Sequence, residues 1–438
     1  MFAMWFALAL GSVPSPAFGS IARPAQSSTS AKPVAQRPTP ILIGRAELGP
    51  DAPGHTYIVD ASGGGDFLDL PPAIAASQAG DVLLMVPGDY SKFTLSKGLT
   101  IVGSAGVHVG AVTIANVPAE ETSVLVGLYN LKPVSIASCP GHVVLQEHTG
   151  AYQLTIDQCS DVRLRDVDVR HLMHGGYDAL LASASRIELA GSLVEGSYLD
   201  VAPGVAGTAL IAENGSRVHV VDSTVWGAFG GIVSNTSFQA PDGGFGVFVD
   251  ATSEVLAIGP LTRVFGGNGG WNMDFDNCDY DGEGASAVAG FGVFAHSTVE
   301  LLGGWTPGFG CTSGGQAASF EPTVIHVASS PLDPELLFVG TPVPGATVQV
   351  EVLGEPGASV VVWLGRQLVL GPGSTLTVEQ LVSHGFMLPP ATLDPNGRAA
   401  WSITLDPSLH PGLVFAMQAE VTAASVLQRT NSVPVVVR

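Results

Sequence analysis

The stretch ALLASASRIELAGSLVEGS, residues 179–197, sets the pattern from which the rest of the chain is interpreted. It contains three short apolar runs that alternate with polar residues and end at small ones. Similar segments begin at residues 209, 246 and 292, and shorter versions precede it. A recurring unit of short strands indicates a solenoid in which each repeat forms one coil.

One apolar position recurs in the middle strand of each unit. We assign it to Val124, Val143, Val162, Ile187, Val218, Val255 and Val299. The spacing lengthens along the chain because residues are inserted at what looks like one corner of the unit, namely 172–177, 198–208, 229–244 and 266–284. The pattern predicts an all-β chain whose residues 56–334 form a right-handed parallel β-helix. The seven anchor residues should share one interior column, and the insertions should form a widening wall.

The last part of the chain, residues 335–438, has a different pattern. Segments such as PGATVQVEVLGEPGASVVVWLG alternate cleanly between apolar and polar residues, as half-buried strands do. About 100 residues with some seven short strands predict a C-terminal immunoglobulin-like β-sandwich.

The N-terminus predicts export. Residues 1–19 contain an apolar run of the length of a secretory signal, which is too short to span a membrane. No later segment is long enough to be a transmembrane segment. Residues 20–55 are rich in Pro, Ser and Ala and predict a linker, within which ILIG, residues 41–44, could pair as a strand. We expect a secreted or cell-surface protein.

The charge balance limits the partners. The chain has 38 acidic and 17 basic side chains and a formal net charge of −21. Phosphate binding needs a basic surface, so nucleic acid and anionic membranes are excluded as partners. A polyanionic ligand would need Ca²⁺ between it and the protein. The oligomeric state stays open.

The stretch YIVDASGGGDFLDLPPAIAASQAGDVLLMVPGDY, residues 57–90, predicts a strand, a glycine loop, a short cap helix that begins after Asp69, and a second strand. It resembles the start of pectin-lyase-like β-helix proteins, including pectin methylesterases. That resemblance implies a surface that contacts carbohydrate. Gly88 and Tyr90 match the esterase Gly-x-Tyr-x-Glu pattern, but Lys92 replaces its glutamate. The esterase and polygalacturonase catalytic motifs are not found, so we expect no release of methanol from pectin.

The segment GWNMDFDNCDYDGEG is the candidate metal site. It holds five carboxylates, Asp274, Asp276, Asp279, Asp281 and Glu283. Hard cations prefer several oxygen ligands, so Ca²⁺ is the expected cofactor if the loop binds metal. Two alternatives stay open, a solvated acidic loop and a pair of catalytic carboxylates.

Aromatic residues near the insertions are the candidate glycan-binding site, because exposed aromatic faces mark binding surfaces. They are Tyr177, Trp226, Trp271, Tyr280 and Trp305. The alternative is that these side chains only pack the loops.

The charged segment DVRLRDVDVRH, residues 161–171, is the remaining candidate site. If its Val and Leu residues point inward, then Arg163, Arg165, Asp166, Asp168 and Arg170 lie outside, either as an exposed charge ladder or as parts of a lyase site. Four cysteines allow up to two disulfides, and Cys139 and Cys159 would stack on adjacent coils, bonded or free. We interpret the chain as a non-catalytic glycan-binding or structural module whose partner is a polysaccharide or cell-surface glycan. The alternative is a polysaccharide lyase or hydrolase that acts on acidic glycans.

Overall fold

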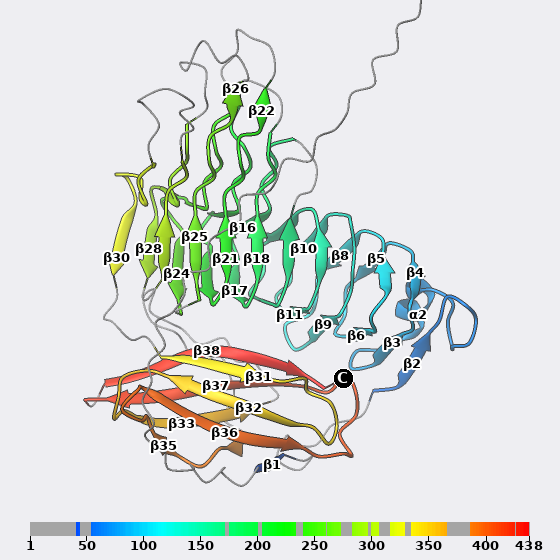
Figure 1. The fold of residues 1–438 in the computed structure, drawn as a ribbon. Coiled ribbons are helices and arrows are strands. Elements are labelled where there is room, and N and C mark those ends of the chain that lie inside the picture. Colours follow the sequence, from blue (N-terminus) through cyan, green and yellow to red (C-terminus); the bar gives the residue numbers. More distant parts are fainter. Residues whose placement is uncertain are drawn as a thin grey trace, which may run out of the picture. The chain divides into compact units, whose positions relative to one another are not determined.

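The protein is represented by a computed structural model that describes residues 41–43, 54–170, 175–199, 204–233, 240–259, 261–272, 283–296, 299–305, 316–328, 334–365, 386–424 and 426–437. Thr39–Arg438 forms one compact unit. Parallel strands build most of it and antiparallel strands build its C-terminal part, so the predicted all-β class is confirmed (Figure 1).

The solenoid is built from three long parallel sheets. The eleven-stranded sheet contains, in spatial order, β2 (Thr56–Val59), β3 (Val82–Met85), β6 (Thr100–Gly103), β9 (Thr122–Val126), β11 (His142–Gln146), β14 (Asp161–Arg165), β17 (Arg186–Ala190), β20 (Arg217–Val221), β24 (Glu254–Ile258), β28 (Val293–His296) and β30 (Ile325–Ala328). The eight-stranded sheet contains β5 (Phe93–Leu95), β8 (Val112–Ala115), β10 (Val134–Ala137), β13 (Leu154–Asp157), β16 (Leu180–Ser183), β19 (Leu210–Glu213), β23 (Val247–Val249) and β27 (Val288–Gly290).

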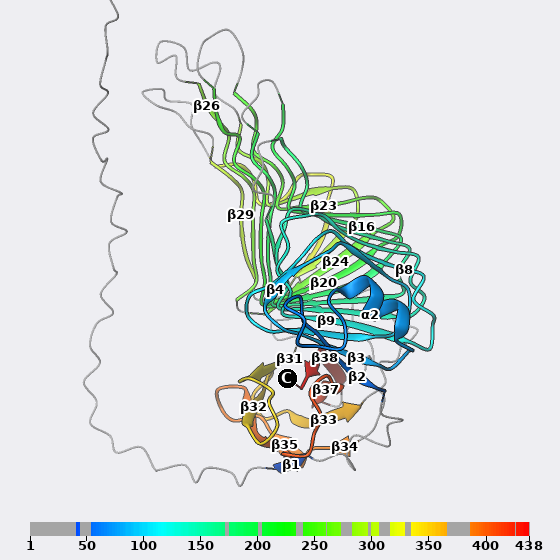
Figure 2. The ribbon, with the colours of Figure 1, turned by 90° about the vertical axis from the view of Figure 1, so that its right-hand side faces the viewer.

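The six-stranded sheet contains β12 (Thr149–Ala151), β15 (Asp168–Arg170), β18 (Leu193–Glu195), β21 (Thr224–Trp226), β25 (Arg263–Phe265) and β29 (Glu300–Leu302). Two short pairs complete the solenoid, β4 (Gly88–Tyr90) with β7 (Val107–Val109) and β22 (Ile232–Val233) with β26 (Trp271–Asn272). Each full coil contributes one strand to each sheet, so the chain forms a parallel β-helix (Figure 2).

The predicted interior column is correct in the middle of the solenoid. Val143, Val162, Ile187, Val218 and Val255 are register partners on successive strands, and all five are buried. The next member of the column is Phe294 and not Val299, because Val299 precedes β29 of the six-stranded sheet. The prediction therefore chose a residue one strand too late in the last repeat.

Val124 is also wrong as a member of this column. Its register partner is Val144, and Ser123 occupies the interior position opposite Val143. Successive side chains of a strand point to opposite faces, so Val124 lies on the outer face of the sheet. There it packs with Val126, Val144 and Ala416 of the C-terminal domain. The outer face is apolar at this place because another domain covers it, which hides the alternation from the sequence.

The N-terminal end of the solenoid is covered by the predicted cap helix, α2 (Leu70–Ala76) (Figure 1). The carboxylate of Asp69 accepts a hydrogen bond from the Leu70 N–H, and prolines occupy the first helical positions, where no N–H partner is needed. Leu70 and Ile74 are buried in the solenoid core. The helix therefore shields core side chains at that end.

The C-terminal domain has two sheets with a shared apolar core. One sheet holds β1 (Ile41–Ile43), β36 (Arg398–Leu405), β32 (Thr347–Leu353) and β31 (Glu335–Val339). The other holds β34 (Phe386–Met387), β35 (Ala391–Thr392), β33 (Ser359–Gly365), β37 (Val414–Ala423) and β38 (Val426–Val436). The pairing is antiparallel apart from β1, and it is compatible with the predicted β-sandwich.

Strand β1 comes from the segment predicted as a linker. Ile41 and Ile43 pair in parallel with Ile403 and Leu405 of β36, at the edge of the first sandwich sheet. The sandwich therefore contains segments that precede the solenoid in the sequence and segments that follow it.

Candidate functional site

The four insertions form one wall. Each lies between a strand of the six-stranded sheet and a strand of the eight-stranded sheet, so all of them leave the solenoid at the same corner. Figure 1 shows β22 and β26 beyond the edge of the sheets, where they pair with each other. This arrangement confirms that the added residues accumulate on one side.

The described part of the wall is held together by backbone hydrogen bonds between outgoing and returning arms. The Gly244 N–H donates to the Ala228 carbonyl, the Gly267 N–H to Gly244 and the Ala285 N–H to Gly267, at 2.7–2.9 Å. The arms approach so closely that a Cβ on Gly267 would lie 1.8 Å from the Ala228 carbonyl oxygen. The glycine richness of the insertions is therefore a packing requirement.

An apolar row runs along the outer face of the six-stranded sheet, beside the wall. Trp226 of β21 is the register partner of Phe265, and Phe265 is the partner of Leu302. The Trp226 and Phe265 rings meet edge to face, with centroids 5.7 Å apart. Trp226 is 44% exposed and Leu302 is 42% exposed. We call Trp226, Phe265 and Leu302 the aromatic row.

Charged residues flank the aromatic row, and they are paired. Arg170 forms an ion pair with Asp168, and hydrogen bonding to that carboxylate raises the pKa of Arg170. Arg263 lies 3.2 Å from Glu300. Glu195 is the register partner of Trp226, and burial raises its pKa. The surface around the row is therefore mixed in charge, and its two arginines are already neutralised.

The other predicted aromatic residues have different positions. Tyr177 and Trp305 are exposed, and the backbone N–H of Trp305 donates to the Asn268 side-chain oxygen. The backbone of Trp271 belongs to β26, and Tyr280 lies outside the described residues. Phe265 and Leu302 were missed as candidates, although they follow Trp226 at the same position of the next two coils and an alignment of repeats could have found them.

The acidic loop falls mostly outside the described residues. The residues that lie outside the description are Asp274, Asp276, Asp279 and Asp281, together with Cys278. Glu283 is described and exposed, and its N–H donates to the Asp242 carboxylate at 2.7 Å. Within the described ranges, no group of three or more His, Cys, Asp or Glu side chains could hold a metal ion. The Ca²⁺ loop stays a prediction.

The charged segment, described as far as Arg170, is exposed only in part, at Asp166 and Arg170. Val162, Leu164, Val167 and Val169 are buried in the core as predicted. Arg163 is on the outer face but only 1% exposed. Its guanidinium lies 3.1 Å from the Asp161 carboxylate, which is itself 2.8 Å from His142 Nδ1. Burial opposes ionisation of Asp161, but the charge of Arg163 and the contact with His142 keep its pKa low.

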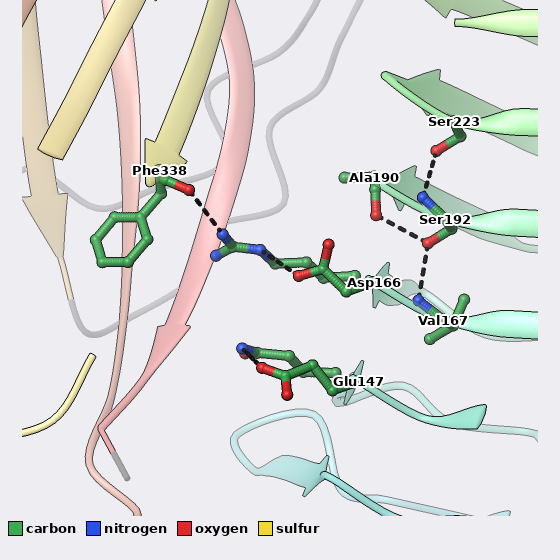
Figure 3. Close-up of polar contacts among 9 residues, drawn as sticks. Glu147, Asp166, Val167, Ala190, Ser192, Ser223 and Phe338 are labelled. Atoms are coloured by element: carbon green, nitrogen blue, oxygen red, sulfur yellow. Dashed lines mark hydrogen bonds and ion pairs between the residues drawn. The ribbon is translucent and has the colours of Figure 1, made fainter. Parts of the chain in front are cut away.

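The neighbouring Arg165 connects the solenoid to the sandwich. Its guanidinium lies 3.3 Å from the Asp166 carboxylate, donates to the Phe338 carbonyl at 3.4 Å and lies over the Phe338 ring. Figure 3 shows Asp166 and Phe338 on the two sides of this contact. These charges are engaged in packing two domains together. The lyase alternative for this segment stays a prediction.

The outer face of the eight-stranded sheet carries few ionisable groups. Its central row changes from Thr94, Thr113, Ser135 and Thr155 to Leu181, Ile211 and Phe248. Asp157 and Glu213 lie at the strand ends, two coils apart with Ser183 between them. They form one pair of carboxylates on this face that an enzymatic mechanism could use.

Cys139 and Cys159 are buried free thiols that interact with each other on adjacent coils.

No helix among the described residues is long and apolar enough to cross a membrane. Comparison of the chain with protein-family models and with curated proteins returned no match.

Proposed function

We propose that the protein binds a polysaccharide or cell-surface glycan through the aromatic row and that it does so without catalysis. The observation that carries this proposal is the register of Trp226, Phe265 and Leu302 on the outer face of the six-stranded sheet. Neighbouring strands lie about 4.8 Å apart, so the row offers apolar surface across three successive strands. An extended chain of sugar rings can lie along such a surface.

The electrostatics favour a glycan of low charge. The arginines beside the row are paired with Asp168 and Glu300, and the whole chain is strongly acidic. An acidic glycan would be repelled unless Ca²⁺ bound with it. The family resemblance of residues 57–90 supports a carbohydrate ligand, and the N-terminal apolar run supports export to where such ligands occur.

Binding is tested on a glycan array, followed by titration of the best ligand. The double variant Trp226→Ala, Phe265→Ala should weaken binding by about 10-fold or more, because aromatic anchors dominate such contacts. The control is Leu68→Ala, which removes an exposed side chain beside the cap helix. Equal binding by the double variant and the control would reject the aromatic row as the site.

Catalysis is tested in parallel by the release of reducing ends, unsaturated products and methanol from the bound glycan and from pectin. We expect no release above a buffer control. Sustained release that is lost in Asp157→Asn, Glu213→Gln would instead establish a polysaccharide hydrolase or lyase.

A further inference from the structure

Two carboxylates from distant parts of the chain meet at one corner of the solenoid. Asp222 follows β20, and Glu335 begins β31 of the sandwich. Glu335 is only 2% exposed, and neither of its carboxylate oxygens accepts a hydrogen bond from the described part of the chain. Asp222 accepts one from the Leu261 N–H at 3.1 Å.

Both carboxylates point at the same small volume. A Cβ built on Gly259 would lie 2.6 Å from Asp222 Oδ1 and 3.1 Å from Glu335 Oε1. Gly259 has a φ of +97°, a conformation that suits glycine. The absence of a side chain at residue 259 therefore leaves room in which the oxygens of both acids converge.

The described basic side chains do not neutralise this pair. Burial and then the neighbouring Asp222 raise the pKa of Glu335 to about 10, with no contribution from a Lys, Arg or His. Arg165, the basic residue that lines the adjoining cavity, is bonded to Asp166. A buried carboxylate beside a second carboxylate, without a cation, is strongly unfavourable unless it keeps a proton or acquires a positive partner.

We propose that Asp222 and Glu335 form a binding site for a hard divalent cation, Ca²⁺, at the contact between the solenoid and the sandwich. Two carboxylates can supply up to four oxygens to such an ion. The adjoining cavity of about 130 Å³, lined in part by Asp222 and Leu336, has room for waters that would complete the coordination. The site is separate from the acidic loop, because neither residue belongs to 274–283.

Binding of Ca²⁺ would give the two carboxylate oxygens of Glu335 the positive partner that they lack among the described residues. Because the ligands come from two domains, the ion should stabilise their contact.

The experiment uses chelator-treated full-length protein titrated with CaCl₂, with calorimetry and melting temperature as readouts. The double variant Asp276→Ala, Asp281→Ala removes two carboxylates of the acidic loop and serves as the matched control. We expect this control to keep the heat of Ca²⁺ binding and the rise in melting temperature that a native-state ligand gives. Glu335→Gln should bind Ca²⁺ about 10-fold more weakly or worse.

Asp222→Asn provides a second test in case Glu335→Gln does not fold. The proposal is overturned if Ca²⁺ has no effect on the wild-type protein, which would make the pair a shared-proton contact only. It is also overturned if every Ca²⁺ effect disappears in the acidic-loop variant and persists in the Glu335 and Asp222 variants.

Discussion

A buried histidine lies inside the solenoid next to a corner of the coil. His148 follows Glu147, which has a left-handed φ of 51°, and its Nε2 lies 3.3 Å from Asn130 Oδ1. The His148 side chain is buried, and burial lowers its pKa to about 4. A histidine in the unfolded chain titrates near 6.5, so protonation of His148 opposes folding.

His148 should therefore make the fold sensitive to acid. Because the folded pKa is lowered, its contribution is fully present above pH 6.5 and is lost as the pH falls toward 4. The unfolding free energy of the wild type should lose up to about 3 kcal/mol from this group between pH 7 and pH 4, and His148→Gln should lose correspondingly less. Denaturant titrations at both pH values measure the difference.

The control for this experiment is His410→Gln, since His410 is exposed. This variant should follow the wild type at both pH values. Parallel pH profiles for the wild type and His148→Gln would contradict the role assigned to burial.

At the scale of elements, the glycine-rich arms of the wall make the strongest prediction. Gly267→Ala places a methyl group against the Ala228 carbonyl, so the outgoing arms of two adjacent coils must separate. We expect a loss of about 1–3 kcal/mol in unfolding free energy, typical of overpacking. Gly88→Ala is the matched control, because its nearest neighbour, the Ala61 side chain, would be 3.3 Å away. Equal stability of the two variants would show that the arms are loosely packed.

The repeating elements could largely be predicted from the sequence, because each strand has the same alternation and each corner the same small residues. The environment of two kinds of residue could not be predicted in this way. Val124 and Val144 look like core residues because the sandwich packs on their outer face. Arg163 looks exposed because its side chain is charged and on the outer face, yet it is buried. An alternation pattern reports burial, but it cannot say which neighbour provides it.

At the scale of the whole molecule, the contact between the sandwich and the solenoid should make unfolding cooperative. Ala416 of β37 packs on Val124, Val126 and Val144. Ala416→Asp would bury a charge there, which costs several kcal/mol unless the domains separate. We expect the single melting transition of the wild type to split into two, as followed by calorimetry.

The control is Val426→Asp, which places the same charge at an exposed residue of β38. It should melt as the wild type does. A single transition for Ala416→Asp would mean that the two domains do not depend on this contact.

Long-range arrangements were the part that the sequence could not predict. The three residues of β1 have strand character, but nothing local specifies a partner more than 350 residues away in β36. The meeting of Asp222 and Glu335 is hidden in the same way, since neither acid has an unusual neighbourhood in the sequence. The aromatic row could be predicted in part, because its three residues occupy the same position in successive repeats.

The position of β1 affects how the molecule would respond to mechanical tension. The chain enters the sandwich at Ile41–Ile43, passes through the whole solenoid and returns to the sandwich at Glu335–Val339. A pulling force applied at residues 41 and 437 would be carried first by the hydrogen bonds of the sandwich sheets. The solenoid would stay unstretched until β1 had torn away from β36, so the sandwich would act as a mechanical clasp that shields the solenoid from tension.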